Sequence, residues 1–70
     1  MIKLKDLLMI WAEDTVFVVR SKYGTTKAKR SDFLTEHIFS SILEVMVFNI
    51  LIRENDDGGN TIFCFVEEAA

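Results

Sequence analysis

The fold of this chain is decided by residues 48–66, which read FNILIRENDDGGNTIFCFV. Two runs rich in β-branched and aromatic residues, 48–53 and 61–66, flank a cluster of Asn, Asp and Gly at 55–60. Residues of that cluster tolerate the positive φ angles that tight turns need. The pattern therefore predicts a β-hairpin.

Apolar residues occupy both faces of this hairpin. One face is predicted to hold Phe48, Ile50, Ile52, Ile62, Cys64 and Val66. The other face is predicted to hold Val47, Leu51, Phe63 and Phe65, with Asn49 and Arg53 between them. A sheet that is apolar on both faces needs cover on both faces. A short chain has few elements for this, so we expect self-association or a protein partner.

The chain length points in the same direction. Its 70 residues are expected to form a single domain, residues 1–70, with a small margin of stability. Small domains compensate with disulfides, metals or oligomerisation. One cysteine excludes an internal disulfide, and one histidine leaves little for a zinc site, so neither a metal nor another cofactor is expected. Half of the residues are hydrophobic, which favours an oligomer.

The sequence favours a cytoplasmic location. No targeting segment is visible, because the apolar run from Leu7 to Ala12 is shorter than a signal-peptide core. The run from Ile38 to Ile52 is interrupted by polar residues and falls short of a membrane span. A free Cys64 fits a reducing compartment. No membrane contact is expected.

The first part of the chain predicts a helix followed by a second hairpin. A stripe at helical spacing predicts a helix over Lys3–Ala12, and it consists of Leu4, Leu7, Leu8 and Trp11. A strand over Thr15–Arg20 follows, then a turn with Gly24 at positive φ, then a polar edge strand over Thr25–Arg30.

The middle of the chain predicts a second helix, over about Ser31–Ser40, with Ser31 as its N-cap. Its apolar stripe is expected to include Phe33, Leu34 and Ile38, and the third strand is expected to begin near Leu43. The predicted order is thus αββαββ. It describes an α+β domain whose two short helices pack on one face of an antiparallel sheet.

Three features carry a resemblance: the "KLKDLL" start, the "EDTVFVV" strand, and the acidic, Gly-containing turn before the last apolar strand. Together they resemble small uncharacterised proteins of phages and prophages in Gram-positive bacteria. The resemblance spans the whole chain. It implies an αββαββ-like fold and a mobile-element context, and it assigns no active-site residue.

Candidate catalytic and metal sites are weak. His37 and Cys64 are the only nucleophile–base pair, and each is more simply explained as a packing residue. The 55–60 loop has oxygen ligands around glycine, but it lacks the terminal glutamate and following helix of a calcium loop. The protein is therefore predicted not to be an enzyme.

A basic stretch gives the rival signal. Between Thr15 and Ser31 there is no acidic residue, while five cations gather there: Arg20, Lys22, Lys27, Lys29 and Arg30. A cationic β-ribbon with Tyr23 at its tip could contact phosphates or a stacked base. Alternatively, lysines on an edge strand prevent unwanted sheet extension, and we prefer this second interpretation.

These observations predict a small interaction module that acts as a homodimer or binds another protein. The expected interface comprises Val47, Leu51, Phe63 and Phe65, extended by Phe17 and Val19 of the first hairpin. The alternative is weak, sequence-independent nucleic-acid binding through the five cations of the basic stretch.

Overall fold

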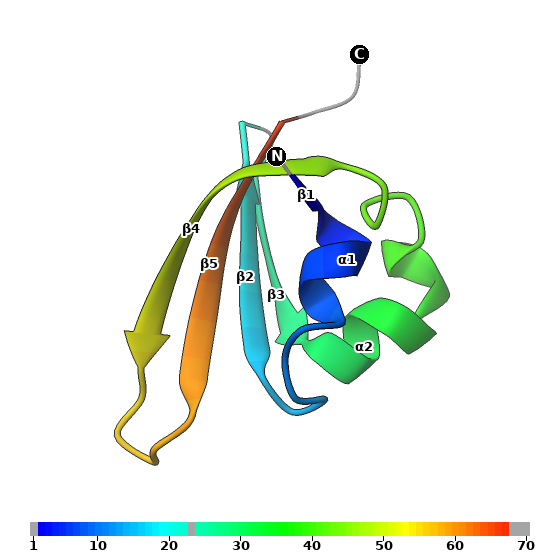
Figure 1. Ribbon diagram of the computed structural model, residues 1–70. Helices are drawn as coiled ribbons and strands as arrows, with labels where there is room; N and C mark the ends of the chain where they lie inside the picture. Colours follow the sequence, from blue (N-terminus) through cyan, green and yellow to red (C-terminus); the bar gives the residue numbers. More distant parts are fainter. Residues whose placement is uncertain (1, 23, 68–70) are drawn as a thin grey trace.

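The structure is a computed structural model that describes residues 2–22 and 24–67. These residues form an α+β fold with a mixed five-stranded sheet and two short α-helices (Figure 1). In chain order the elements are β1 (Ile2–Lys3), α1 (Leu4–Leu8), β2 (Val16–Ser21), β3 (Gly24–Lys29), α2 (Arg30–Thr35), the 3₁₀ turn η1 (His37–Phe39), β4 (Met46–Glu54) and β5 (Asn60–Glu67). The predicted order did not include β1 or η1.

The sheet is not purely antiparallel, so that prediction is wrong. Its strand order is β1-β4-β5-β2-β3, and β2 and β5 run parallel. The reason lies in the connection between the two hairpins. From the edge strand β3 the chain crosses the helical side of the sheet and re-enters at β4, which leaves the central place for β5 (Figure 1). A crossover of this kind is what parallel pairing requires.

The hairpin predicted over residues 48–66 is confirmed. Ile50 lies opposite Cys64, and Ile52 lies opposite Ile62. In the turn, the Asn55 amide donates a hydrogen bond to the Gly59 carbonyl at 2.7 Å. Gly58 has a φ of 88°, a conformation that glycine adopts without strain.

A β-bulge at Phe48 changes the faces of two residues. Val47 pairs with Val66, and Asn49 pairs with Phe65, so Phe48 is an extra residue in the ladder. An extra residue reverses the alternation of side chains that precede it. Val47 is therefore 3% exposed, on the core side, whereas Phe48 is 58% exposed. The predicted faces of Val47 and Phe48 are wrong for this reason.

The core lies between the helices and one face of the sheet, and both helices stand on that side (Figure 1). Its buried residues are Leu4, Leu7, Leu8, Phe17, Val19, Phe33, Val47, Ile62, Cys64 and Val66. Phe33 contacts Phe17 edge-on, with ring centroids 6.4 Å apart. Phe17 and Val19, predicted to extend the interface, are thus core residues. Their register partners on β5 are Ile62 and Cys64.

The first helix is shorter than the predicted Lys3–Ala12. Two interactions with distant segments fix its ends. The Leu4 amide donates to the Val45 carbonyl at 2.9 Å, and the Arg30 Nε donates to the Leu8 carbonyl at 2.7 Å. A cationic donor on a terminal carbonyl is a known way to end a helix. Trp11 lies beyond this end and packs partly on the core, with its Nε1 buried and without a hydrogen-bond partner.

The second helix begins and ends earlier than predicted. Lys29, not Ser31, occupies the N-cap, and the amide of Ser31 donates to the Glu13 carbonyl at 3.0 Å. That backbone partner replaces the predicted side-chain cap. Glu36 is extended and separates α2 from η1, which turns Ile38 outward to 79% exposure. The predicted stripe is therefore buried only at Phe33, since Leu34 is 37% exposed.

We predict that Phe33→Ala and Ile38→Ala differ sharply in stability, although one sequence stripe contains both. Phe33 is fully buried, so its truncation is expected to cost about 3–5 kcal/mol of unfolding free energy. Ile38 is mostly exposed, and its truncation is expected to cost less than about 0.5 kcal/mol. Urea unfolding followed by circular dichroism measures both. Equal losses would contradict the described end of α2.

Candidate functional site

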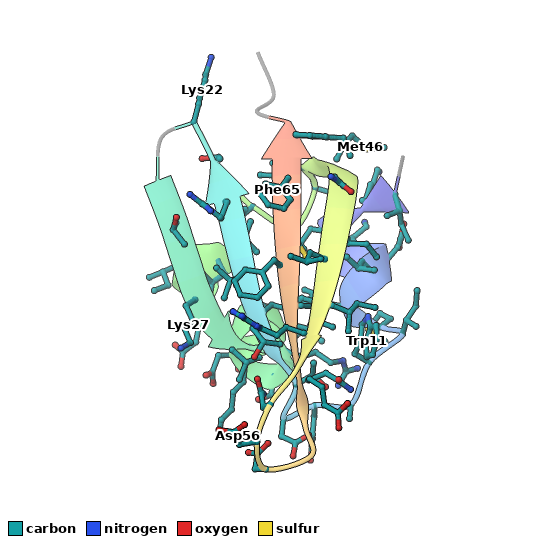
Figure 2. All side chains as sticks on the ribbon, turned by 90° about the vertical axis from the view of Figure 1, so that its left-hand side faces the viewer. Trp11, Lys22, Lys27, Met46, Asp56 and Phe65 are labelled. Atoms are coloured by element: carbon teal, nitrogen blue, oxygen red, sulfur yellow. The ribbon has the colours of Figure 1, made fainter. Side chains whose placement is uncertain are left out.

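The sheet face turned away from the helices is the candidate site, and we call it the open face. The register assigns it Val16, Val18, Arg20, Thr25, Lys27, Lys29, Asn49, Leu51, Arg53, Thr61, Phe63 and Phe65, to which the bulge adds Phe48. Figure 2 views the sheet from this side, with Phe65 on the central strand and Lys27 on β3. No helix stands on this side in Figure 1.

A row of apolar side chains crosses the middle of the open face. Val18 on β2 lies beside Phe63 on β5, and Phe63 lies beside Leu51 on β4. Leu51 is 59% exposed, and Phe63 and Phe65 are half-buried. Three of the four predicted interface residues, Leu51, Phe63 and Phe65, therefore share one accessible surface.

Four cations share the same face. Lys27 lies opposite Val18, and Lys29 lies opposite Val16. Arg20 is the neighbour of Phe65, with its guanidinium carbon 6.0 Å from the ring centroid, at the limit of a cation–π contact. Arg53 lies opposite Thr61. The sequence predicts the basic stretch and the apolar interface as alternative binding surfaces. The structure brings Arg20, Lys27 and Lys29 onto the apolar face and adds Arg53.

The other described cations lie at the margin of this face or outside it. Lys3 and Lys5 contact Glu44 at 3.1 and 2.8 Å, and these contacts hold the pKa of the Glu44 carboxyl below its ordinary value. Arg30 belongs to the helix side, where it caps α1. Lys22 directly follows the end of β2 (Figure 2). It lines a hollow together with Arg20, Phe48 and Phe65 of the open face. Arg30 is therefore not part of the basic surface that the sequence predicted.

The described charges of the open face are all positive. Among the side chains that the structure describes, no Asp or Glu occupies one of its register positions. Glu54 pairs with Asn60 and so alternates to the helix side, while Asp56 and Asp57 lie in the hairpin turn. A chain with a net charge of −3 thus presents a cationic surface with aromatic rings at its centre.

The structure does not combine His37 and Cys64 into a site. His37 lies exposed in η1, whereas Cys64 is 0% exposed in the core. Burial raises the pKa of the Cys64 thiol to about 11, so the reactive thiolate is disfavoured. Within residues 2–22 and 24–67 there is no cluster of three or more His, Cys, Asp or Glu side chains suited to a metal ion. Within the same residues no helix has the length and apolar character needed to cross a membrane.

Comparison of the chain with protein-family models, curated proteins and solved structures gave no match.

We predict that Cys64 resists thiol reagents until the protein unfolds. With a pKa of about 11, its thiolate fraction at pH 8 is only about one in a thousand, and its burial also blocks access. Ellman's reagent should label native protein slowly and urea-unfolded protein at once. Ile10→Cys is the matched control, because Ile10 is 67% exposed and its thiol should react rapidly in native protein. Fast labelling of native wild type would contradict the position of β5.

Proposed function

We propose that this protein is a non-enzymatic interaction module whose open face binds single-stranded nucleic acid. The supporting observation is that Phe63 and Phe65 lie on a central strand among four cations on one uncovered face. Aromatic rings stack with bases, and cations neutralise phosphates. The phage-type resemblance belongs to this proposal as context and does not determine the ligand.

The spacing of the rings suits unstacked bases. Residues i and i+2 of a strand are about 7 Å apart, which is about twice the stacking distance of bases. Phe63 and Phe65 would therefore each receive a base from a strand whose bases are splayed apart, as in sheet-based RNA recognition. A duplex keeps its bases stacked and cannot use the rings in this way.

The charges disfavour the face-to-face homodimer that the sequence suggested. Face-to-face packing would bury Arg20, Lys27, Lys29 and Arg53 of both copies in one interface, where no described acidic side chain faces them. Like charges that lose water without a partner are strongly destabilising. Single-stranded nucleic acid suits this face better, because its bases can stack on the rings and its phosphates can neutralise the cations.

We predict salt-sensitive binding of a labelled single-stranded oligonucleotide in fluorescence anisotropy. The slope of log K against log salt is about −0.7 per neutralised phosphate, so four cations predict a slope near about −3. Lys27→Ala should flatten the slope and weaken binding. Lys5→Ala is the matched control, since Lys5 pairs with Glu44 away from the open face. Undetectable binding of both DNA and RNA strands at low salt would refute the proposal.

The rings give a further prediction. Phe65→Leu keeps apolar bulk but removes the stacking surface, and the loss of one stacked base corresponds to about 1–3 kcal/mol, or about 5- to 150-fold in affinity. A poly-glutamate titration tests an acidic protein segment as the alternative ligand. The contradicting result is that poly-glutamate binds as tightly as the oligonucleotide does, with Phe65→Leu changing the affinity for neither ligand. In that case the face recognises acidic protein and the proposal is wrong.

A further inference from the structure

The two edges of the sheet are protected differently. At one edge, β3 carries Lys27 and Lys29, which hinder pairing with another strand. At the other edge, the described part of β1 pairs only with Met46 and Val47 of the nine-residue β4. Residues 48–54 of β4 thus have an uncovered outer edge, with no Lys or Pro among them. Unpaired backbone of this kind is a template for another strand.

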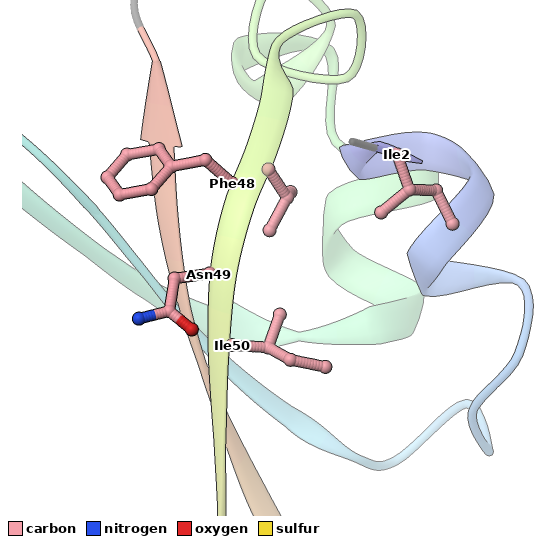
Figure 3. A pocket seen from close by; sticks show the side chains of 5 residues that line it. Ile2, Phe48, Asn49 and Ile50 are labelled. Carbon is pink, nitrogen blue, oxygen red and sulfur yellow. The ribbon is translucent and has the colours of Figure 1, made fainter.

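This free edge is apolar on both faces. Phe48 and Leu51 face the open side, and Ile50 and Ile52 face the helix side, with exposures of 58%, 59%, 41% and 49% in that order. Beside the edge lies an open hollow of about 380 Å³, lined by Ile2, Val47, Phe48, Asn49 and Ile50. Figure 3 shows Ile2 and Ile50 on the helix side of β4, and Phe48 and Asn49 on the other side.

We propose that β4 pairs antiparallel with β4 of a second copy about a two-fold axis at Leu51. After the bulge, the regular part of the free edge is Asn49–Arg53, and Leu51 is its middle residue. The axis sets Leu51 opposite Leu51 of the second copy. It sets Ile50 opposite Ile52, and Asn49 opposite Arg53, on both sides of the axis. Every exposed apolar residue of this segment then meets an apolar residue.

The charges and the hollow both favour a second copy as the occupant. Arg53 of each copy meets Asn49, and the two Arg53 residues lie four positions apart, at roughly 13 Å. Edge pairing therefore avoids the cation repulsion of face-to-face packing. Ile52 of the second copy would lie opposite Ile50, next to Ile2 along this edge. Ile2 and Ile50 form the helix-side part of the lining of the hollow, so Ile52 would cover that part.

The expected dimer is reversible. The paired apolar side chains of each copy are only Ile50, Leu51 and Ile52, each about half exposed, so the interface is smaller than the about 800 Å² per partner of a standard one. An interface below the standard size is typical of a weak, reversible association. An axis perpendicular to the sheet keeps both open faces on the same side, so pairing doubles that surface.

Disulfide trapping tests the register. Directly opposed residues of antiparallel strands have Cα atoms about 4.5–5.5 Å apart, which is within disulfide range. Leu51→Cys should therefore give a covalent dimer under mild oxidation. Arg53→Cys, on the same face and strand, should not, whereas a mixture of Arg53→Cys with Asn49→Cys should give the mixed dimer. Cys64 is fully buried and should not interfere. Equal trapping of Leu51→Cys and Arg53→Cys would overturn the proposed axis.

Sedimentation equilibrium tests the dimer itself. Wild type should show a concentration-dependent monomer–dimer equilibrium, and Ile52→Lys should weaken it by at least about tenfold because a buried charge faces Ile50. Ile10→Lys makes the same change at a site that is 67% exposed and outside β4, and it should leave the equilibrium unchanged. Circular dichroism verifies that both variants fold. A wild-type monomer at millimolar concentration, or equal effects of the two variants, would overturn the proposal.

Discussion

The structure depends on the central position of β5. Its even-numbered residues Ile62, Cys64 and Val66 are buried under the helices, and Phe63 and Phe65 alternate to the open face. Because strand residues alternate strictly, the burial that holds the core together also fixes the rings on the outside. β5 is paired along both edges, to β2 and to β4, so the rings stand on a rigid support. Their exposure is a consequence of the fold.

The alternation of apolar residues along the strands allowed only part of this arrangement to be predicted from the sequence. The two apolar runs and the Asn/Asp/Gly cluster predicted the second hairpin, the shared face of Ile50 and Cys64, and the burial of Cys64. The bulge at Phe48 was not predictable, because no glycine or other sequence signal marks it. One inserted residue reversed the faces of Val47 and Phe48, and a period-two pattern cannot reveal an insertion.

The helices were predicted poorly because contacts between distant segments decide their ends. Arg30 was predicted to be a surface cation, but it caps α1 through the Leu8 carbonyl. At the other end of α1, the Val45 carbonyl accepts a hydrogen bond from the Leu4 amide. Likewise, the parallel pairing of β2 with β5 placed the basic hairpin beside Phe63 and Phe65. The sequence indicated both the basic first hairpin and the apolar face of the second hairpin. It did not indicate that the two lie on one surface, because they are far apart in the chain.

The central claim is that the open face is the functional surface, and amide chemical-shift mapping tests it most directly. A titration of ¹⁵N-labelled protein with a short single-stranded oligonucleotide should shift amides of β5, β2 and β3, with the largest changes around Phe63, Phe65 and Lys27. The amides of α1 and α2, on the covered face, should remain in place. Shifts confined to the helices, or a spectrum unchanged at saturating oligonucleotide, would contradict the account.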